Sequence, residues 1–248
     1  MSKGSILFRN DLLVIMMNIK KIREQEKLSH VEIYTRAKLY EKGTWLEKPV
    51  KTVMDLLSDI ENREDIRILD LGCGIGRNAI AIARHFQNRH CIVDCVDLLD
   101  VAVEKLKENA AAYCVSDSIR TYVDTIEHFP ISANAYDYIL AVSALEHVDC
   151  TQTFREKLQQ IRNGIRIGGI VCLILNSGVR EVHKETGVQM PAQFETNLPA
   201  QELLSILSEI FSGWTILKSG VKTQQYDIPR QEGICELSTQ VVTFAAKK

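Results

Sequence analysis

The feature that most constrains the fold is an apolar run that ends in an acid and then opens into three alternating glycines. Residues 66–71 form a short apolar segment, and Gly72, Gly74 and Gly76 follow it directly. Residues 79–83 then have the composition of a helix, so the stretch is predicted to be strand, tight turn and helix. Such a turn brings backbone N–H groups and a helix N-terminus close to a ligand, because glycine has no Cβ to block the approach.

An acid in this motif indicates the charge of the ligand. Dinucleotide-binding folds hold a pyrophosphate with the spacing G-x-G-x-x-G, whereas the spacing here is G-x-G-x-G, with Asp70 two residues before the first glycine. A carboxylate repels a phosphate but accepts a hydrogen bond from an ammonium group. The motif therefore favours a cationic ligand, although on its own it leaves open a purely structural turn.

Strand-like and helix-like segments alternate along the rest of the chain. This alternation predicts an α/β fold with a largely parallel sheet, and the unbroken apolar run at 170–175 fits a strand that is covered on both faces. We expect residues 176–199 to be irregular, residues 230–235 to form a polar loop, and residues 240–246 to form a strand at the edge of the sheet. The expected strands lie at 66–71, 91–96, 119–123, 136–142, 170–175, 214–217 and 240–246, and the expected helices include residues 101–110, 154–165 and 203–207.

Two segments resemble the class I S-adenosylmethionine-dependent methyltransferases. Residues 68–78 match their acid-and-glycine motif, and residues 136–148, which run from Tyr-Asp-Tyr to Leu-Glu-His-Val, are similar to the small-molecule branch. The resemblance implies a Rossmann-like, seven-stranded, mostly parallel sheet with helices on both faces. It also implies S-adenosylmethionine as cofactor, S-adenosylhomocysteine as product and no metal.

A narrower resemblance is to the tellurite-resistance methyltransferase group, which methylates small anions or thiol- and selenol-like acceptors. It rests on residues 72–78 and 136–142 and on the pairs 202–203 and 213–214.

The expected cofactor contacts lie at the ends of the first four strands. Asp97 follows the glycines by about 20 residues, where a carboxylate suits the two ribose hydroxyls because it accepts two hydrogen bonds; a role as a helix cap is the alternative. The resemblance places Asp124 near the adenine, with a plain strand-end cap as the alternative. The full set of predicted cofactor residues is Asp70, Gly72, Cys73, Gly74, Gly76, Asp97, Leu98, Asp124, Thr125 and Ala141.

His147 is the candidate catalytic residue. The unperturbed pKa of a histidine lies near neutrality, which suits a general base, although a packing role remains open. Arg77 is a candidate for orienting an anionic acceptor or for bonding to local carbonyl groups. The fourth strand is followed neither by Asn-Pro-Pro-Tyr nor by Pro-Cys, which argues against methylation of nucleic acid bases.

Three alternatives to a small-molecule methyltransferase remain: an RNA or protein methyltransferase of the same fold, a nucleotide-dependent oxidoreductase, and a binding module without catalysis.

Residues 1–60 are predicted to form a helical extension or lid, and residues 61–248 the cofactor-binding domain. A capping-box pattern at residues 29–32 begins a helix that is expected to end at Gly43. The apolar run at residues 12–17 is too short for a membrane span, and Met16 and Met17 leave open whether residues 1–16 belong to the natural protein. Candidates for the acceptor lining are His30, Tyr34, Arg36, Tyr40 and Trp45, each of which could equally be an ordinary helix residue.

Charge and cysteine content limit the partners and the compartment. The net charge of −2 predicts no general attraction to nucleic acid or to an anionic membrane. Seven cysteines occur without a C-x-x-C pair, and the odd number indicates reduced thiols in the cytoplasm. We therefore expect a cytoplasmic enzyme with a small-molecule acceptor and neither a nucleic acid nor a membrane partner, either as a monomer or as a homodimer.

Overall fold

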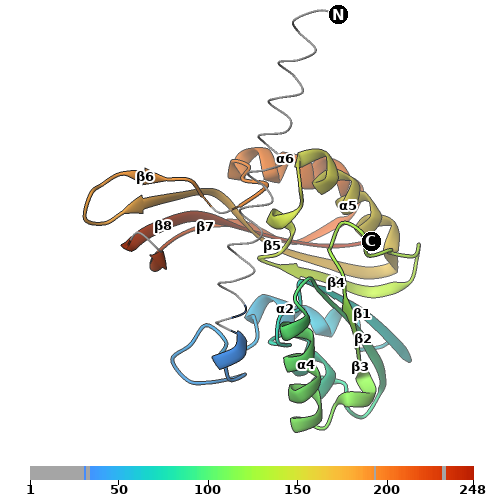
Figure 1. Cartoon of the computed structure of the whole chain (residues 1–248). Helices are drawn as coiled ribbons and strands as arrows, with labels where there is room; N and C mark the ends of the chain where they lie inside the picture. Colours follow the sequence, from blue (N-terminus) through green and yellow to red (C-terminus); the bar gives the residue numbers. More distant parts are fainter. Residues whose placement is uncertain (1–30, 32–33, 193, 231–232) are drawn as a thin grey trace, which may run out of the picture.

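The fold is built on one mixed sheet. The computed structural model of the chain describes residues 31, 34–192, 194–230 and 233–248 (Figure 1). Seven strands follow one path in the order β3-β2-β1-β4-β5-β8-β7, and the two-residue β6 pairs with β5 beside it. The strands are β1 (Asp65–Leu71), β2 (His90–Asp97), β3 (Ile119–Val123), β4 (Tyr136–Val142), β5 (Ile165–His183), β6 (Gln189–Met190), β7 (Thr215–Arg230) and β8 (Gly233–Lys247). The predicted α/β class and mostly parallel sheet are confirmed, with β6 as an eighth strand.

The sheet order reverses next to β1. The first five strands of the path pair in parallel, whereas β8 is antiparallel to both β5 and β7. Parallel neighbours need crossover connections, which are supplied by α3 (Ala79–His85), α4 (Asp100–Ala112) and α5 (Thr151–Gly164). The carboxyl ends of β1 and β4 therefore flank the point where the strand order reverses, which is where open α/β sheets bind ligands.

Helices cover both faces of the sheet. One core layer packs α3, α4, α2 (Lys51–Asp55) and the short η1 (Leu56–Asp59) against one face, and the other packs α5 and α6 (Ala200–Ile210) against the opposite face. Strand β1 shows why both layers form: Ile66 and Ile68 enter the first layer, whereas Leu69 and Leu71 enter the second. Because both faces are covered, β1 and β4 are apolar with little alternation.

The C-terminal half departs from the sequence-based expectations. Residues 176–183, expected to be irregular, continue β5, and β7 and β8 reach far into the expected loop at 230–235. The last strand lies between β5 and β7 and is not at the edge. Two pairings explain these corrections: residues 176–183 of β5 pair with β8, which is distant from them in sequence, and β7 pairs with β8 in a hairpin that reaches residues 230 and 233. Together the three strands form an arm that projects past the helices (Figure 1).

Only part of the N-terminal prediction falls on described residues. Residues 34–36 are helical, and the chain turns at Tyr40, which has a positive φ of 62°, before it reaches Gly43. Several predictions fall outside the described residues. These are the start of the capping box, the candidate His30, the apolar run at 12–17, and whether residues 1–16 belong to the natural protein. Among the described helices, none is both long and apolar enough to cross a bilayer. The boundary at residue 60 between an N-terminal extension and the cofactor-binding domain stays a prediction.

A buried carboxylate joins three neighbouring segments at the amino ends of β1, β4 and β5. The Asp137 side chain, which has no exposed surface, accepts a hydrogen bond from the Arg67 backbone N–H at 2.8 Å and one from Arg166 Nη1 at 2.9 Å. Arg63 Nη1 lies 3.0 Å from its other oxygen. These contacts satisfy a charge that would otherwise be costly to bury.

Replacing Asp137 by Ala therefore leaves the Arg67 N–H without its acceptor and two guanidinium groups without their anion. Because those guanidinium groups are about a third exposed and can turn to water, we expect a loss of about 2–3 kcal/mol in the free energy of unfolding. Urea denaturation measures it, with the exposed Asp117→Ala as the matched control. A loss equal to that of the control would show that the cluster does not hold the strands.

Candidate functional site

The glycine loop is held by contacts that exclude side chains. Gly72 and Gly76 have φ values of 75° and 93°, which L-residues rarely adopt. A Cβ on Gly72 would lie 2.3 Å from Ala144 Cβ, and one on Gly76 would lie 2.2 Å from Leu106 Cδ1. The N–H groups of Gly72 and of the next residue both donate to Val96 O of β2, at 2.8 and 3.0 Å. The loop is therefore packed between β2, α4 and the segment after β4.

Gly74 is a buried residue of the loop. Its φ is 52°, and a Cβ there would lie 3.1 Å from the Tyr34 hydroxyl. Tyr34, a predicted lining residue, thus lies against the loop from the N-terminal side. Cys73 is buried, and burial is the main cause that raises the pKa of its thiol well above the usual value, so it is an unreactive packing residue.

The other N-terminal candidates contact the helix start beside the loop. Tyr40 donates to Arg77 O at 3.0 Å, and the Arg77 guanidinium lies over the Trp45 ring at 5.6 Å. Arg77 Nε donates to Lys48 O at 2.7 Å. Arg77 therefore takes the second of its two predicted roles and bonds to a nearby carbonyl. Arg36 is exposed.

Asp97 is oriented by two backbone donors. Gly74 N donates to Asp97 Oδ2 at 2.8 Å, and Leu99 N donates to Oδ1 at 3.0 Å. A carboxylate has about four acceptor positions, so these bonds fix the group and leave it further acceptor capacity. Leu98, beside it, has 45% of its surface exposed.

Asp70 is a buried carboxylate with an unused oxygen. It is 1% exposed, and its Oδ2 has no hydrogen-bond partner among the described residues. Burial, and secondarily the negative charge of Asp97, raise the pKa of Asp70 to about 7. A buried acceptor is costly to leave unpaired, so this geometry fits the predicted cationic or hydrogen-bond-donating ligand group.

The end of β3 meets the same edge of the sheet. Asp124 N donates to Asp97 O at 3.0 Å, and Asp124 Oδ1 accepts a bond from Thr125 N at 2.8 Å. Both residues are half-buried. Ala141, by contrast, is fully buried in β4, between the paired strands β1 and β5. Its side chain therefore belongs to the core. The exposed residue that follows β4 is Ser143, at a positive φ of 50°.

His147 lies in the short η3 (Leu145–His147) after β4. Its Nδ1 is 3.1 Å from Glu195 Oε2, and its ring stacks on Phe194 with the centroids 5.2 Å apart. The Glu195 carboxylate has no exposed surface. Sequence reasoning missed both partners, because residues 194 and 195 fall in a segment without periodicity, 48 residues from His147.

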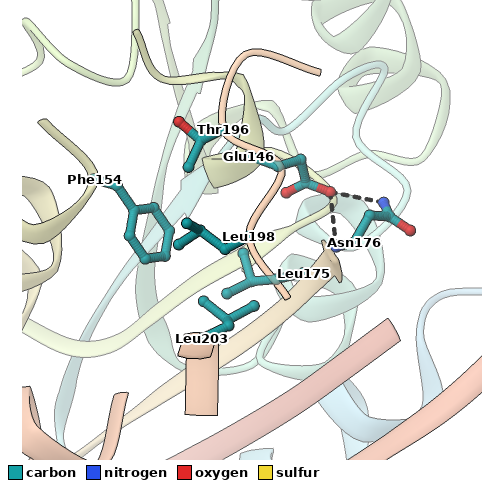
Figure 2. A pocket seen from close by; sticks show the side chains of 7 residues that line it. All are labelled: Glu146, Phe154, Leu175, Asn176, Thr196, Leu198 and Leu203. Carbon is teal, nitrogen blue, oxygen red and sulfur yellow. Dashed lines mark hydrogen bonds between the residues drawn. The ribbon is translucent and has the colours of Figure 1, made fainter. Parts of the chain in front are cut away.

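Glu146 is a second buried acid that sequence reasoning did not assign. It is 2% exposed, and its Oε1 accepts bonds from the backbone N–H and the side-chain amide of Asn176, at 3.0 and 2.7 Å. Figure 2 shows these bonds at the wall of a pocket. Burial raises the pKa of Glu146. An acid inside an otherwise apolar segment was a visible signal, but its partner lies 30 residues away.

Comparison with known proteins agrees with this geometry. Residues 68–169 match the family model described as "Methyltransferase domain". The carboxy-S-adenosyl-L-methionine synthases of Shewanella sediminis and Shewanella piezotolerans are 28% and 26% identical, over 127 and 110 residues. These matches cover 49% and 43% of this chain, and 50% and 43% of those proteins. The chain thus spans about half the length of the curated relatives it matches.

Solved structures share the fold at low identity. TehB from Haemophilus influenzae is 20% identical with a TM-score of 0.60, covering 84% of this chain and 64% of that chain. Geranyl diphosphate C-methyltransferase from Streptomyces coelicolor, solved with Mg²⁺, geranyl diphosphate and S-adenosyl-L-homocysteine, is 16% identical with a TM-score of 0.54, covering 79% and 78%. In the described part of this chain, no group of three or more His, Cys, Asp or Glu side chains is placed to hold a metal.

Replacing Asp70 by Asn isolates the titration of the buried acid. The pKa of Asp70 is about 7 in the folded protein, whereas the ordinary value for an aspartate is 3.8. The folded state therefore binds the proton more tightly than the unfolded state. The free energy of unfolding therefore falls as pH rises from about 4 to about 7 and then levels. We expect the gain of Asp70→Asn over the wild type to grow across that window in urea denaturation. A pH-independent difference at Asp70 would contradict the assignment.

Proposed function

We propose that this chain, whose residues 68–169 match the methyltransferase-domain family model, is a class I S-adenosylmethionine-dependent methyltransferase that transfers a methyl group to a small-molecule acceptor. The observation that carries the proposal is the pair of carboxylates around the glycine loop. Asp97 is held by the Gly74 N–H, and Asp70 keeps a buried oxygen without a partner. Two acids around a backbone cradle suit a ligand that bears hydroxyl and ammonium groups and no phosphate.

The residues around the cradle have separate tasks in this proposal. Asp97, positioned by backbone donors, would accept hydrogen bonds from the two ribose hydroxyls. Asp70 would receive the amino group of the cofactor, whose positive charge favours the ionised carboxylate. Asp124 and Thr125, joined to Asp97 through the Asp124 N–H, would lie beside the adenine, with the exposed Leu98 near them.

The domain's chemical contribution is chiefly alignment. S-adenosylmethionine, when bound, supplies a methyl group already activated by the adjoining sulfonium. The chain's part is then to hold the acceptor atom in line with that methyl group and to exclude water, and positioning of this kind can lower a barrier by about 7–11 kcal/mol in favourable cases. Ser143 and His147 follow β4 at the edge of the sheet where the acceptor would meet the methyl group.

His147 is proposed to take the proton that the acceptor loses. With Nδ1 directed at Glu195, the ring would carry its proton on Nδ1 and keep Nε2 as the basic nitrogen. Stacking on Phe194 fixes the plane of the ring. Glu195 is then a positioning residue for His147.

A second candidate function is modification of the cofactor itself. Two matched relatives are named carboxy-S-adenosyl-L-methionine synthases. By analogy, this chain could exchange one methyl hydrogen of the cofactor for the carboxyl group of a carboxylated co-substrate: the methyl carbon loses a proton and forms the new carbon–carbon bond, and the co-substrate takes up a proton where its carboxyl group left. Mass spectrometry of the nucleoside released from the purified protein separates the two functions. Carboxy-S-adenosylmethionine in that sample would favour the second.

Calorimetric titration with S-adenosylmethionine and S-adenosylhomocysteine tests the cofactor site. We expect micromolar binding by the wild type and a loss of about a hundredfold or more in Asp97→Ala, because two hydrogen bonds to a charged group are removed. Asp100→Ala is the matched control, since Asp100 is an exposed acid whose Oδ1 accepts a bond from the N–H of its neighbour. Absence of binding to either nucleoside would refute the proposal.

The role of His147 is tested by methyl transfer from labelled S-adenosylmethionine to an acceptor found in a panel of alcohols, amines and thiols. His147→Ala is expected to lower kcat by about 10²–10⁴-fold, the usual contribution of a general base. Glu195→Gln should lower kcat less and leave KM unchanged, because the ring is misoriented but present. Unchanged kcat in His147→Ala, with cofactor affinity intact, would return the residue to a packing role.

A further inference from the structure

An irregular segment before α6 joins η3 to β5. It comprises residues 194–198, here called the strap, which belong to neither a helix nor a strand. Figure 2 shows the strap residue Thr196 beside Glu146 of η3, with Asn176 of β5 on the other side of the glutamate. Because the strap has no ladder or helix of its own, its conformation depends on the bonds it makes to these two elements.

Thr196 holds the backbone on both sides of His147. Its N–H donates to Glu146 O at 2.9 Å, and its hydroxyl donates to Val148 O at 2.8 Å. Thr196 is 6% exposed, so both bonds are shielded from water. The two residues that flank His147 in the chain are therefore fixed by one residue of the strap.

The two strap residues before Thr196 fix the imidazole itself. Phe194 stacks on the ring with an angle of 21° between the two planes, and Glu195 Oε2 lies 3.1 Å from His147 Nδ1. Neither contact covers the Nε2 edge of the ring. An acceptor that gives its proton to His147, as its nucleophilic atom bonds to the methyl carbon, therefore has to approach that edge.

The strap is anchored to β5 by its other end. The Asn197 side chain accepts a bond from Val179 N at 2.8 Å and donates one to Val179 O at 2.9 Å. The next residue of the strap accepts a bond from the N–H of Gly178, which donates to Leu198 O at 2.8 Å. The strap thus follows the backbone of β5 for two residues beyond the point where β4 has ended.

Glu146 closes the frame between β5 and η3. Its Oε1 accepts bonds from the backbone N–H and the side-chain amide of Asn176, at 3.0 and 2.7 Å. The three segments η3, strap and β5 are therefore joined in a closed ring of hydrogen bonds, and His147 belongs to the η3 side of that ring. A side chain held in this way loses little freedom when a reactant binds, which is the condition for efficient positioning.

We propose that the strap orients His147 for proton transfer, and that Thr196 is the positioning residue through which it does so. The inference rests on the proposed function for the role of His147 as the base. Without the Thr196 hydroxyl, Val148 O loses its donor and η3 can move against the strap, so that Nδ1 and Glu195 separate. The ring then populates both tautomers, and a ring with its proton on Nε2 cannot accept another there.

Nuclear magnetic resonance tests the orientation of the ring without any acceptor. The nitrogen-15 shifts of the imidazole, assigned by their loss in His147→Ala, distinguish the Nδ1–H tautomer from the Nε2–H tautomer. We expect the Nδ1–H tautomer in the wild type and in Thr196→Ser, which keeps the hydroxyl, and a mixture of both in Thr196→Val. The matched control is Thr223→Val at an exposed position of β7, which should leave the tautomer unchanged.

A second variant makes the test independent of the folding of Thr196→Val. Asn197 is exposed, so Asn197→Ala releases the strap from Val179 without opening a cavity in the core. We expect the same mixture of tautomers in this variant.

A double-mutant cycle tests the catalytic consequence with S-adenosylmethionine and an acceptor that the wild type methylates. Thr196→Val should lower kcat about tenfold, the usual effect of removing one buried hydrogen bond, and should leave the acceptor KM and the cofactor affinity unchanged. Thr196→Ser should keep kcat within about twofold of the wild type, because the bond is retained. In the His147→Ala background, Thr196→Val should have no further effect, because Thr196 acts through the histidine.

Two results would overturn the inference. One is an unchanged tautomer of His147 in Thr196→Val and Asn197→Ala, and the other is an equal loss of kcat on Thr196→Val with and without the histidine. Failure of the proposed function is a separate outcome, seen as the absence of S-adenosylmethionine binding or as an unchanged kcat in His147→Ala. The tautomer measurements need neither cofactor nor acceptor, so the two failures are distinguishable.

Discussion

The hydrogen bond from Gly74 N to Asp97 Oδ2 connects the two halves of the binding edge. It joins the turn after β1 to the end of β2, and it is made only because Gly72 and Gly76 carry no side chains that would push the loop away from Ala144 and Leu106. Through Asp97 the end of β3 is also tied in. The turn after β1 and the ends of β2 and β3 therefore share one geometry, which depends on backbone N–H groups and on the Asp97 carboxylate.

The sequence predicted the fold wherever local pattern and final environment agree. Strands β3 and β4 match their predicted limits. Strand β4 is a buried apolar run, whereas β3 is a mostly exposed edge strand whose β-branched and aromatic residues favour the strand state. The predictions for residues 176–183, 230 and 233–235 were wrong, because polar residues occur on both faces of these strands in the arm and no apolar alternation marks them. Residues 176–183 are strand because they pair with β8, which no local window around them contains, whereas residues 230 and 233–235 extend the β7–β8 hairpin.

The same division runs through the site. The placement of Asp97 beside the glycine loop was predictable, because it depends on spacing within one strand-turn-helix unit and the next strand, whereas the cofactor roles of Asp70, the glycines and Asp97 stay predictions. The pairs of His147 with Glu195 and of Glu146 with Asn176 join segments separated by 48 and 30 residues. These residues lie in irregular or newly extended segments, so their meeting depends on tertiary packing that periodicity does not encode.

The interior position of β8 bears on how the chain reaches this structure during synthesis. Strands β5 and β7 both precede β8 in the sequence, yet each needs it as a neighbour. While the chain is being made, both strands emerge with unsatisfied N–H and C=O groups along one side, a condition that invites pairing with other nascent chains. The parallel strands from β1 to β5 can associate as they emerge, whereas the arm can form only after β8, its middle strand, has been synthesised. Its assembly is therefore the step at which aggregation competes with folding.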